Sequence, residues 1–263
     1  MLFGIGLGDS SLETLGKKPA KLAQLEQTIG VIRGLIAGET VTHPESKAPV
    51  HITYARKGTR VPIYSGVSSP KVTRLAGKVA DGAIVLVGVD AEYLKAARRE
   101  LELGAAEAGR DLRKEGFRVV CWVPCSVQAD GQAARAAVKA HVARILKRPL
   151  PFELDPETKE AVRRIYEHYE YYEHMVAGTA HGELVPDALV EKFAIAGTRA
   201  EVQQQVERLA ATGLVDEIAI IPHTPDPVHR ERIIRQVGEM IPELTRSSCR
   251  SPIDPLIDSS NVR

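Results

Sequence analysis

A glycine loop near the amino end could place an acid and a hydroxyl beside a flat ligand. Gly6 and Gly8, on either side of Leu7, lack a Cβ, so the backbone there can approach another surface closely. Asp9 and Ser10 follow just past a predicted strand, where barrels and open α/β sheets hold their chemistry. Asp9 could exchange a proton beside a bound ring, or it could only cap a helix after packing glycines. The residues alone leave both interpretations open.

A second segment is suited to binding an anion. Residues 66–71 read Gly-Val-Ser-Ser-Pro-Lys and lie between a predicted strand and a predicted helix. Ser69 at the N-cap and Pro70 at the first helical position would leave free amides and hydroxyls at the helix start, with Lys71 nearby. This pattern predicts a phosphate or other anion site. The alternative is an ordinary capped helix.

The histidines and cysteines give weaker signals. Glu170 and His174 share a helix face but lack the His-Glu-x-x-His order of zinc sites, so a solvated helix is the favoured interpretation and no metal site is predicted. His223 follows the last predicted strand, where barrel enzymes place substrate contacts. Cys121 and Cys125 would stand roughly 13 Å apart in a strand that rises about 3.3 Å per residue, so both are predicted to be packing residues.

Composition and charge argue against a nucleic-acid-binding protein and against a membrane-spanning one. The 263 residues carry 35 Lys and Arg against 34 Asp and Glu, a net charge of +1, which gives no electrostatic footprint for nucleic acid or an anionic membrane. No apolar run approaches the roughly 20 residues that a membrane-spanning helix needs. We therefore expect a cytoplasmic protein with neither a nucleic-acid partner nor a membrane partner.

Strands and helices alternate along the chain and must position these segments. After a first strand that leads into the glycine loop, the pattern predicts strands over 61–65, 83–87, 117–127 and 217–222 and helices over 19–37, 70–80, 91–108, 130–146, 198–213 and 227–241. Apolar strands of this kind predict a parallel sheet covered on both faces. The five β-α units fit an open doubly wound sheet or part of an eight-stranded barrel.

Taken in order, these segments resemble the bacterial-luciferase-like family of flavin- and deazaflavin-dependent oxidoreductases. The branch they are most similar to is the methylenetetrahydromethanopterin reductase-like one, and the resemblance covers about residues 2–245. The residues that carry it are Gly4 to Ser10 with Leu15 and Gly16, Leu25 to Glu39, Val61 to Lys71, Leu75 to Gly82, Val185 to Asp187, Phe193 to Thr198 and Gly213 to Pro222.

The resemblance implies an α/β fold of the (βα)8 TIM-barrel type, N-terminally truncated, with about strands 4–8 present. Family members begin with three further β-α units, so this chain is expected to be truncated or to pair with another chain. Residues 1–245 would form the partial barrel, with an insertion over about 149–196, and residues 246–263 a disordered tail. The open sheet edges predict a homo-oligomer.

The resemblance also implies a function. We expect an oxidoreductase that uses reduced deazaflavin, coenzyme F-420, for hydride transfer to or from a small organic substrate. One alternative is an FMN-dependent monooxygenase of the same family, and another is a catalytically inactive remnant or oligomerising subunit. Asp9 would be catalytic, and the cofactor would contact Leu7, Gly8, Asp9, Ser10, Gly66, Val67, Ser68 and Ser69.

Overall fold

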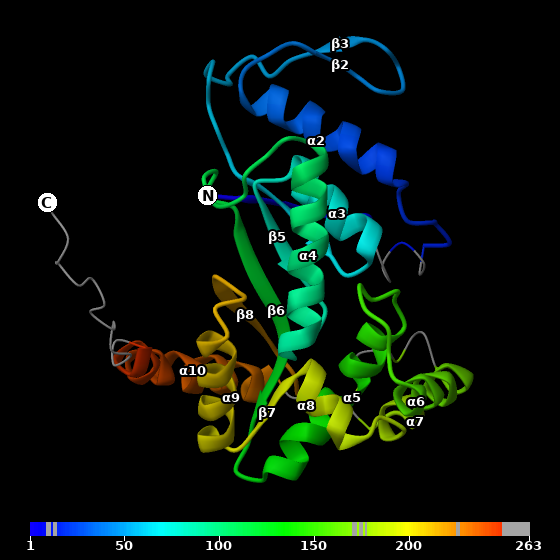
Figure 1. Ribbon diagram of the computed structural model, residues 1–263, viewed down its shortest axis with the longest axis vertical. Coiled ribbons are helices and arrows are strands. Elements are labelled where there is room, and N and C mark those ends of the chain that lie inside the picture. The colour runs from blue at the N-terminus through cyan, green and yellow to red at the C-terminus, as the bar shows by residue number, and fades with distance from the viewer. Residues whose placement is uncertain are drawn as a thin grey trace, which may run out of the picture.

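The fold is built on one parallel sheet of six strands. The computed structural model describes residues 1–8, 12, 15–169, 173, 176, 178–224 and 227–248 (Figure 1). The strands of the sheet are β1 (Phe3–Ile5), β4 (Ile63–Val67), β5 (Gly82–Val85), β6 (Arg118–Val127), β7 (Ile195–Gly197) and β8 (Glu217–Pro222). Every pairing between them is parallel, as the apolar strands predict.

Helices follow the strands in the predicted alternation. They are α2 (Leu22–Ile36), α3 (Pro70–Val79), α4 (Ala91–Glu107), α5 (Gly131–Leu146), α6 (Pro156–Glu167), α7 (Ala180–Glu183), α8 (Asp187–Phe193), α9 (Arg199–Ala211) and α10 (Pro227–Ser248). Helix α9 opens with a capping box between Thr198 and Glu201, as the Thr-x-x-Glu spacing at the start of the predicted helix 198–213 indicates. The count of five β-α units is wrong, because β7 lies at the end of the stretch 149–196, whose sequence breaks the alternation. The segment 39–60 also contains a short antiparallel hairpin, β2 (Val41–Thr42) and β3 (Pro49–Val50).

The long strand β6 organises the sheet. Cys121 is paired with both β5 and β8, and Cys125 is paired with both β7 and β8. Because a strand has two edges, β5 and β7 share one edge of β6 and β8 takes the other. The described strands therefore form an open α/β sheet of the barrel type, and they do not close into a barrel.

One face of the sheet carries the main core. Along β6 the residues Val119, Cys121 and Val123 are almost fully buried beneath the helices. Trp122 points to the other face, since side chains alternate along a strand, and it is 43% exposed. The prediction that Cys121 and Cys125 are packing residues is confirmed, since both are buried free thiols. Burial raises the pKa of each thiol to about 12.

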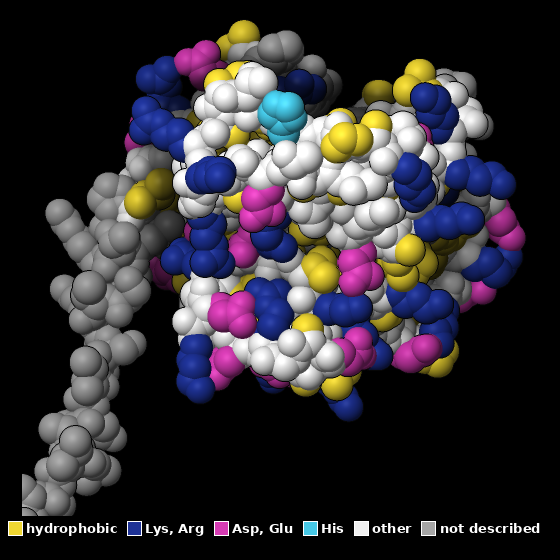
Figure 2. Space-filling view, turned by 90° about the horizontal axis from the view of Figure 1, so that it is seen from above, with side chains coloured by type: hydrophobic (Ala, Val, Ile, Leu, Met, Phe, Trp, Pro, Cys, Tyr) yellow, Lys and Arg dark blue, Asp and Glu magenta, His cyan; other side chains and the backbone are white. Residues whose placement is uncertain are grey.

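Two glycines let α3 and α4 pack backbone to backbone. A Cβ added at Gly77 would lie 1.9 Å from the carbonyl oxygen of Leu101, and one added at Gly104 would lie 1.8 Å from that of Arg74. No larger residue fits at either position without moving a helix. This close contact fixes α3 against α4. Figure 2, seen from the α2 end, shows basic and acidic side chains interspersed over the surface.

Candidate active site

The two segments predicted to hold a cofactor end on neighbouring strands. β1 pairs with β4 in parallel, with Ile5 opposite Ser65, so the glycine loop and the start of α3 leave the sheet side by side at its carboxyl edge. A Cβ added at Gly6 would lie 3.6 Å from the carbonyl oxygen of Gly66. The structure thus brings together the two predicted halves of the site, residues 6–8 and 66–69.

The glycine loop is locked by backbone conformation. Gly8 has a φ of +90°, which favours glycine, and a Cβ there would lie 2.1 Å from Cδ1 of Leu12. Leu7 is half-buried against the core, and its carbonyl oxygen accepts a hydrogen bond of 2.9 Å from the amide of Ala20. Asp9 and Ser10 lie outside the described residues. Their predicted roles therefore stay predictions.

The start of α3 has the features of an anion site. Ser69 is the N-cap residue and Pro70 takes the first helical position, as predicted, but within the described part of the chain the Ser69 side chain does not cap the helix. The first helical bond runs from the amide of Thr73 to the carbonyl oxygen of Ser69, which leaves the amides of Lys71 and Val72 at the open end of the helix. Those amides and the helix dipole favour a negative group there.

The other predicted cofactor contacts, Gly66, Val67 and Ser68, differ in which of their atoms could contact a ligand. Val67 is buried and its side chain is part of the core, so only its backbone could face a ligand. Gly66, within β4, and Ser68, in the turn that follows the strand, are both half-buried. The turn therefore presents small side chains and backbone to a ligand.

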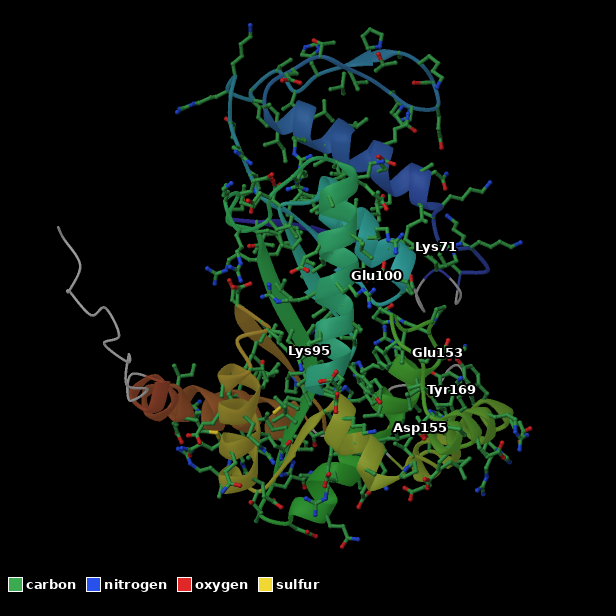
Figure 3. The ribbon with its side chains drawn as sticks, in the orientation of Figure 1. Lys71, Lys95, Glu100, Glu153, Asp155 and Tyr169 are labelled. Atoms are coloured by element: carbon green, nitrogen blue, oxygen red, sulfur yellow. The ribbon has the colours of Figure 1, made fainter. Side chains whose placement is uncertain are left out.

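An aromatic stack ties the loop after α5 to the start of α4. Tyr93, early in α4, stacks on Phe152 with ring centroids 3.7 Å apart and an interplanar angle of 6°. Phe152 belongs to the loop between α5 and α6, so this stack ties the loop to the carboxyl end of β5. Figure 3 labels Lys71, near the start of α3, above Glu153 and Tyr169, which come from the chain after α5.

Three buried histidines lie near the carboxyl end of the sheet, and the sequence had indicated only one of them. His223 directly follows β8, as predicted, and its Nε2 lies 2.5 Å from Nδ1 of His141 on α5. His181 lies 3.2 Å through Nε2 from the Thr179 hydroxyl, and its ring is 4.6 Å from that of Tyr169. His141 and His223 are 82 residues apart, so no local pattern could have paired them.

Burial and positive charge keep His223 neutral. Desolvation, together with the guanidinium groups of Arg230 and Arg144, lowers the pKa of His223 to about 4. The ring is therefore uncharged at neutral pH, with one nitrogen that donates a hydrogen bond and one that accepts. Glu170 and His174, the pair that shares a predicted helix face, lie outside the described residues. Among the described residues, no group of three or more His, Cys, Asp and Glu side chains could hold a metal ion.

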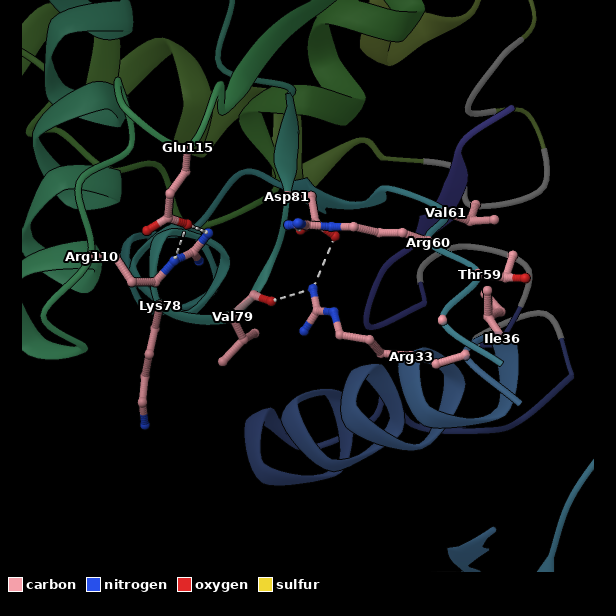
Figure 4. A pocket seen from close by; sticks show the side chains of 12 residues that line it. Arg33, Ile36, Thr59, Arg60, Val61, Lys78, Val79, Asp81, Arg110 and Glu115 are labelled. Carbon is pink, nitrogen blue, oxygen red and sulfur yellow. Dashed lines mark hydrogen bonds and ion pairs between the residues drawn. The ribbon is translucent and has the colours of Figure 1, made fainter. Parts of the chain in front are cut away.

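A hollow of about 550 Å³ lies at the opposite, amino end of β4 and β5 (Figure 4). Asp81 accepts hydrogen bonds of 2.9 Å from both Arg33 on α2 and the amide of Ile63 at the start of β4. Burial raises the pKa of the Asp81 carboxyl, but these two hydrogen bonds and the charges of Arg33 and Arg60 outweigh it and hold the pKa below its ordinary value. We assign this polar cluster to holding α2 against the sheet.

Sequence comparisons identify relatives over most of the chain. Residues 1–216 match the family described as luciferase-like monooxygenase. The 5,10-methylenetetrahydromethanopterin reductase of Archaeoglobus fulgidus is 27% identical over 253 residues, which cover 92% of this chain and 73% of the reductase. An F-420-dependent glucose-6-phosphate dehydrogenase of Microbacterium testaceum is 37% identical over 118 residues, 42% of this chain and 35% of that enzyme.

Structural comparison agrees on the fold. The coenzyme F-420-dependent tetrahydromethanopterin reductase of Methanopyrus kandleri superposes with a TM-score of 0.69 at 23% identity, over 92% of this chain and 74% of that chain. An EDTA monooxygenase from Chelativorans superposes with a TM-score of 0.56 at 15% identity, over 90% and 63%. With the family match over more than half of its residues, the chain belongs to the luciferase-like monooxygenase family.

Proposed function

We propose that this protein is an oxidoreductase that uses reduced coenzyme F-420 for hydride transfer to or from a small organic substrate. Membership of the family supports an enzyme, and relatives named as reductases and dehydrogenases dependent on coenzyme F-420 favour the deazaflavin. The cofactor supplies the hydride chemistry when bound, and the protein binds and orients it.

The residues of the carboxyl edge fit such a cofactor. Gly6 has no Cβ, and its nearest neighbour at that position is the carbonyl oxygen of Gly66 at 3.6 Å, so the edge of a flat ring could approach the backbone beside Leu7. The phosphate-bearing side chain would lie at Ser68 and Ser69, against the open amides of α3. Asp9 would hold or release a proton beside the ring, with Ser10 next to it.

The observation that carries the proposal is the placement of both cofactor segments on the paired strands β1 and β4. Were they on distant strands, one ligand could not contact both. Here the start of α3 and the glycine loop adjoin, so a single extended cofactor can reach from one to the other.

Ser69→Asp tests the phosphate end of this site. Aspartate is a favourable N-cap residue, so α3 should keep its stability, while the added carboxylate repels a bound phosphate. We expect F-420 affinity, measured by fluorescence titration, to fall at least about tenfold, equal to about 1.4 kcal/mol. The matched control is Ser46→Asp on the exposed hairpin loop, which should bind as the wild type does. Equal affinity of all three proteins would contradict this placement of the phosphate.

The FMN-dependent monooxygenase is the second candidate, because the matched family is described as luciferase-like monooxygenase. Both cofactors carry a phosphate and a flat ring, so the geometry of residues 6–8 and 66–69 suits either. The relative affinity of the two cofactors separates the candidates. A folded chain that binds neither would instead fit the inactive or oligomerising subunit.

We also propose that the protein is a homo-oligomer. β1 pairs only with β4 within the described residues, which leaves its other edge open, and Met1, Leu2 and Phe3 are exposed there. Trp122 is exposed on the sheet face opposite the helices. Open edges and apolar faces of this kind are commonly covered by another chain. Light scattering should give more than the 28.6 kDa of one chain, and a monomer at micromolar concentration would refute this.

None of the described helices has the length and apolar character to cross a membrane.

A further inference from the structure

A buried line of hydrogen bonds joins α5 to the carboxyl end of β8, and the cofactor contacts make no use of it. His141 is 1% exposed and His223 is 7% exposed. Nδ1 of His141 lies 2.5 Å from Nε2 of His223, and Nη1 of Arg144 lies 3.4 Å from Nε2 of His141. Three basic side chains therefore follow one another in a row, from Arg144 to His223.

The chemistry of these groups fixes where each proton lies. A guanidinium group has only donors, so Nε2 of His141 must accept from Arg144. A neutral imidazole has one donor and one acceptor nitrogen, so Nδ1 of His141 carries the proton and donates a hydrogen bond to Nε2 of His223. His223 must then carry its own proton on Nδ1. The row turns His223 into a hydrogen-bond donor with a fixed direction.

The surroundings of His223 select a negative acceptor. Arg144 and Arg230 both act on the ring electrostatically, and Nε of Arg230 donates to the carbonyl oxygen of Thr224, the next residue. None of the described residues accepts a hydrogen bond from Nδ1 of His223. A directed N–H in the field of two guanidinium groups favours an oxyanion. Since β8 is parallel to β6 and its neighbours, His223 leaves the sheet at the same carboxyl edge as the glycine loop.

We propose that Nδ1 of His223 donates a hydrogen bond to an oxyanion of the substrate, a carboxylate or a phosphate, and that His141 is the positioning residue that sets this donor. The assignment of the oxyanion to the substrate rests on the proposed function. The proton arrangement of the two histidines does not, and it can be measured without cofactor.

The first measurement is the tautomer of each ring, read from long-range ¹H–¹⁵N spectra of histidine-labelled protein above the titration range of histidine. His141 and His223 should both carry the proton on Nδ1. His43 is an internal reference of the opposite kind, because its Nδ1 accepts from the amides of Glu45 and Ser46 at 3.3 and 3.2 Å, which puts its proton on Nε2. A proton on Nε2 of His223 would overturn the proposal.

The second measurement is a titration of the same sample with sodium acetate and, separately, with inorganic phosphate. A saturable shift of the His223 ring, with His43 unmoved, supports the site, and the more effective anion identifies carboxylate or phosphate. His141→Phe removes the positioning donor, so His223 should become a mixture of tautomers and anion affinity should fall roughly five- to tenfold. If neither anion moves the His223 signal of the wild type, the proposal is wrong, whether or not the protein binds coenzyme F-420.

Discussion

Replacing Gly77 by alanine tests whether α3 is held against α4 by direct backbone packing. The new Cβ would lie 1.9 Å from the carbonyl oxygen and 2.7 Å from the carbonyl carbon of Leu101, so α3 and α4 must separate. Overpacking costs about 1–3 kcal/mol and occasionally more, against about 1 kcal/mol gained in helix propensity. Because the obstructing atoms are backbone, we expect a cost above that range, about 4 kcal/mol, and therefore a net loss of about 3 kcal/mol.

The assay is urea unfolding followed by circular dichroism, with thermal unfolding alongside. For a chain of this size a loss of about 3 kcal/mol lowers Tm by roughly 6–12 °C. Gly30→Ala is the matched control, since Gly30 also lies inside a helix but a Cβ there meets nothing within 4 Å. That variant should gain about 1 kcal/mol. If Gly77→Ala were as stable as Gly30→Ala, the close contact between α3 and α4 would be refuted.

Three further predictions concern charge and packing. The pKa of His223 is about 4 in the folded protein against an ordinary value of 6.5, so only the unfolded chain gains this proton as the pH falls from about 6.5 to 4. His223 should therefore lower the free energy of unfolding by about 3 kcal/mol at pH 4. In His223→Gln the urea midpoint should fall less steeply with decreasing pH. Asp81→Asn removes the ion pair with Arg33 and should lower the free energy of unfolding by about 1–3 kcal/mol at pH 7, as measured by urea unfolding. Because the pKa of Asp81 is lowered in the folded protein, the stability that this carboxylate adds to the wild type should be lost as the pH falls below the ordinary pKa of an aspartate. Phe152→Ala removes the stack on Tyr93 and should lower stability by about 1–2 kcal/mol and speed proteolysis within the α5–α6 loop, whereas unchanged cleavage would contradict the anchoring role.

The sequence predicted the elements that follow strong local rules. The apolar run of β6, the Pro70 start of α3 and the Thr198 capping box all have local causes, and the structure confirms them. The short strand β7 was not predicted, because three residues are too few to show the alternation of apolar and polar residues that marks a strand. Its existence depends on pairing with β6, which is a tertiary contact.

The candidate site divides in the same way. The glycine loop and the turn before α3 could be predicted because each motif is contiguous in sequence. The pairing of His141 with His223 could not, since it depends on β8 lying beside β6 rather than on any spacing along the chain. A lone histidine in a helix otherwise resembles any satisfied core residue.

The most direct test of the proposed function is a fluorescence titration of the purified wild-type chain with coenzyme F-420 and, separately, with FMN. The proposal predicts saturable binding of coenzyme F-420 at micromolar levels, tighter than that of FMN, through residues 6–10 and 66–69. Tighter binding of FMN would contradict the deazaflavin assignment. Failure of a folded chain to bind either would contradict the enzyme itself.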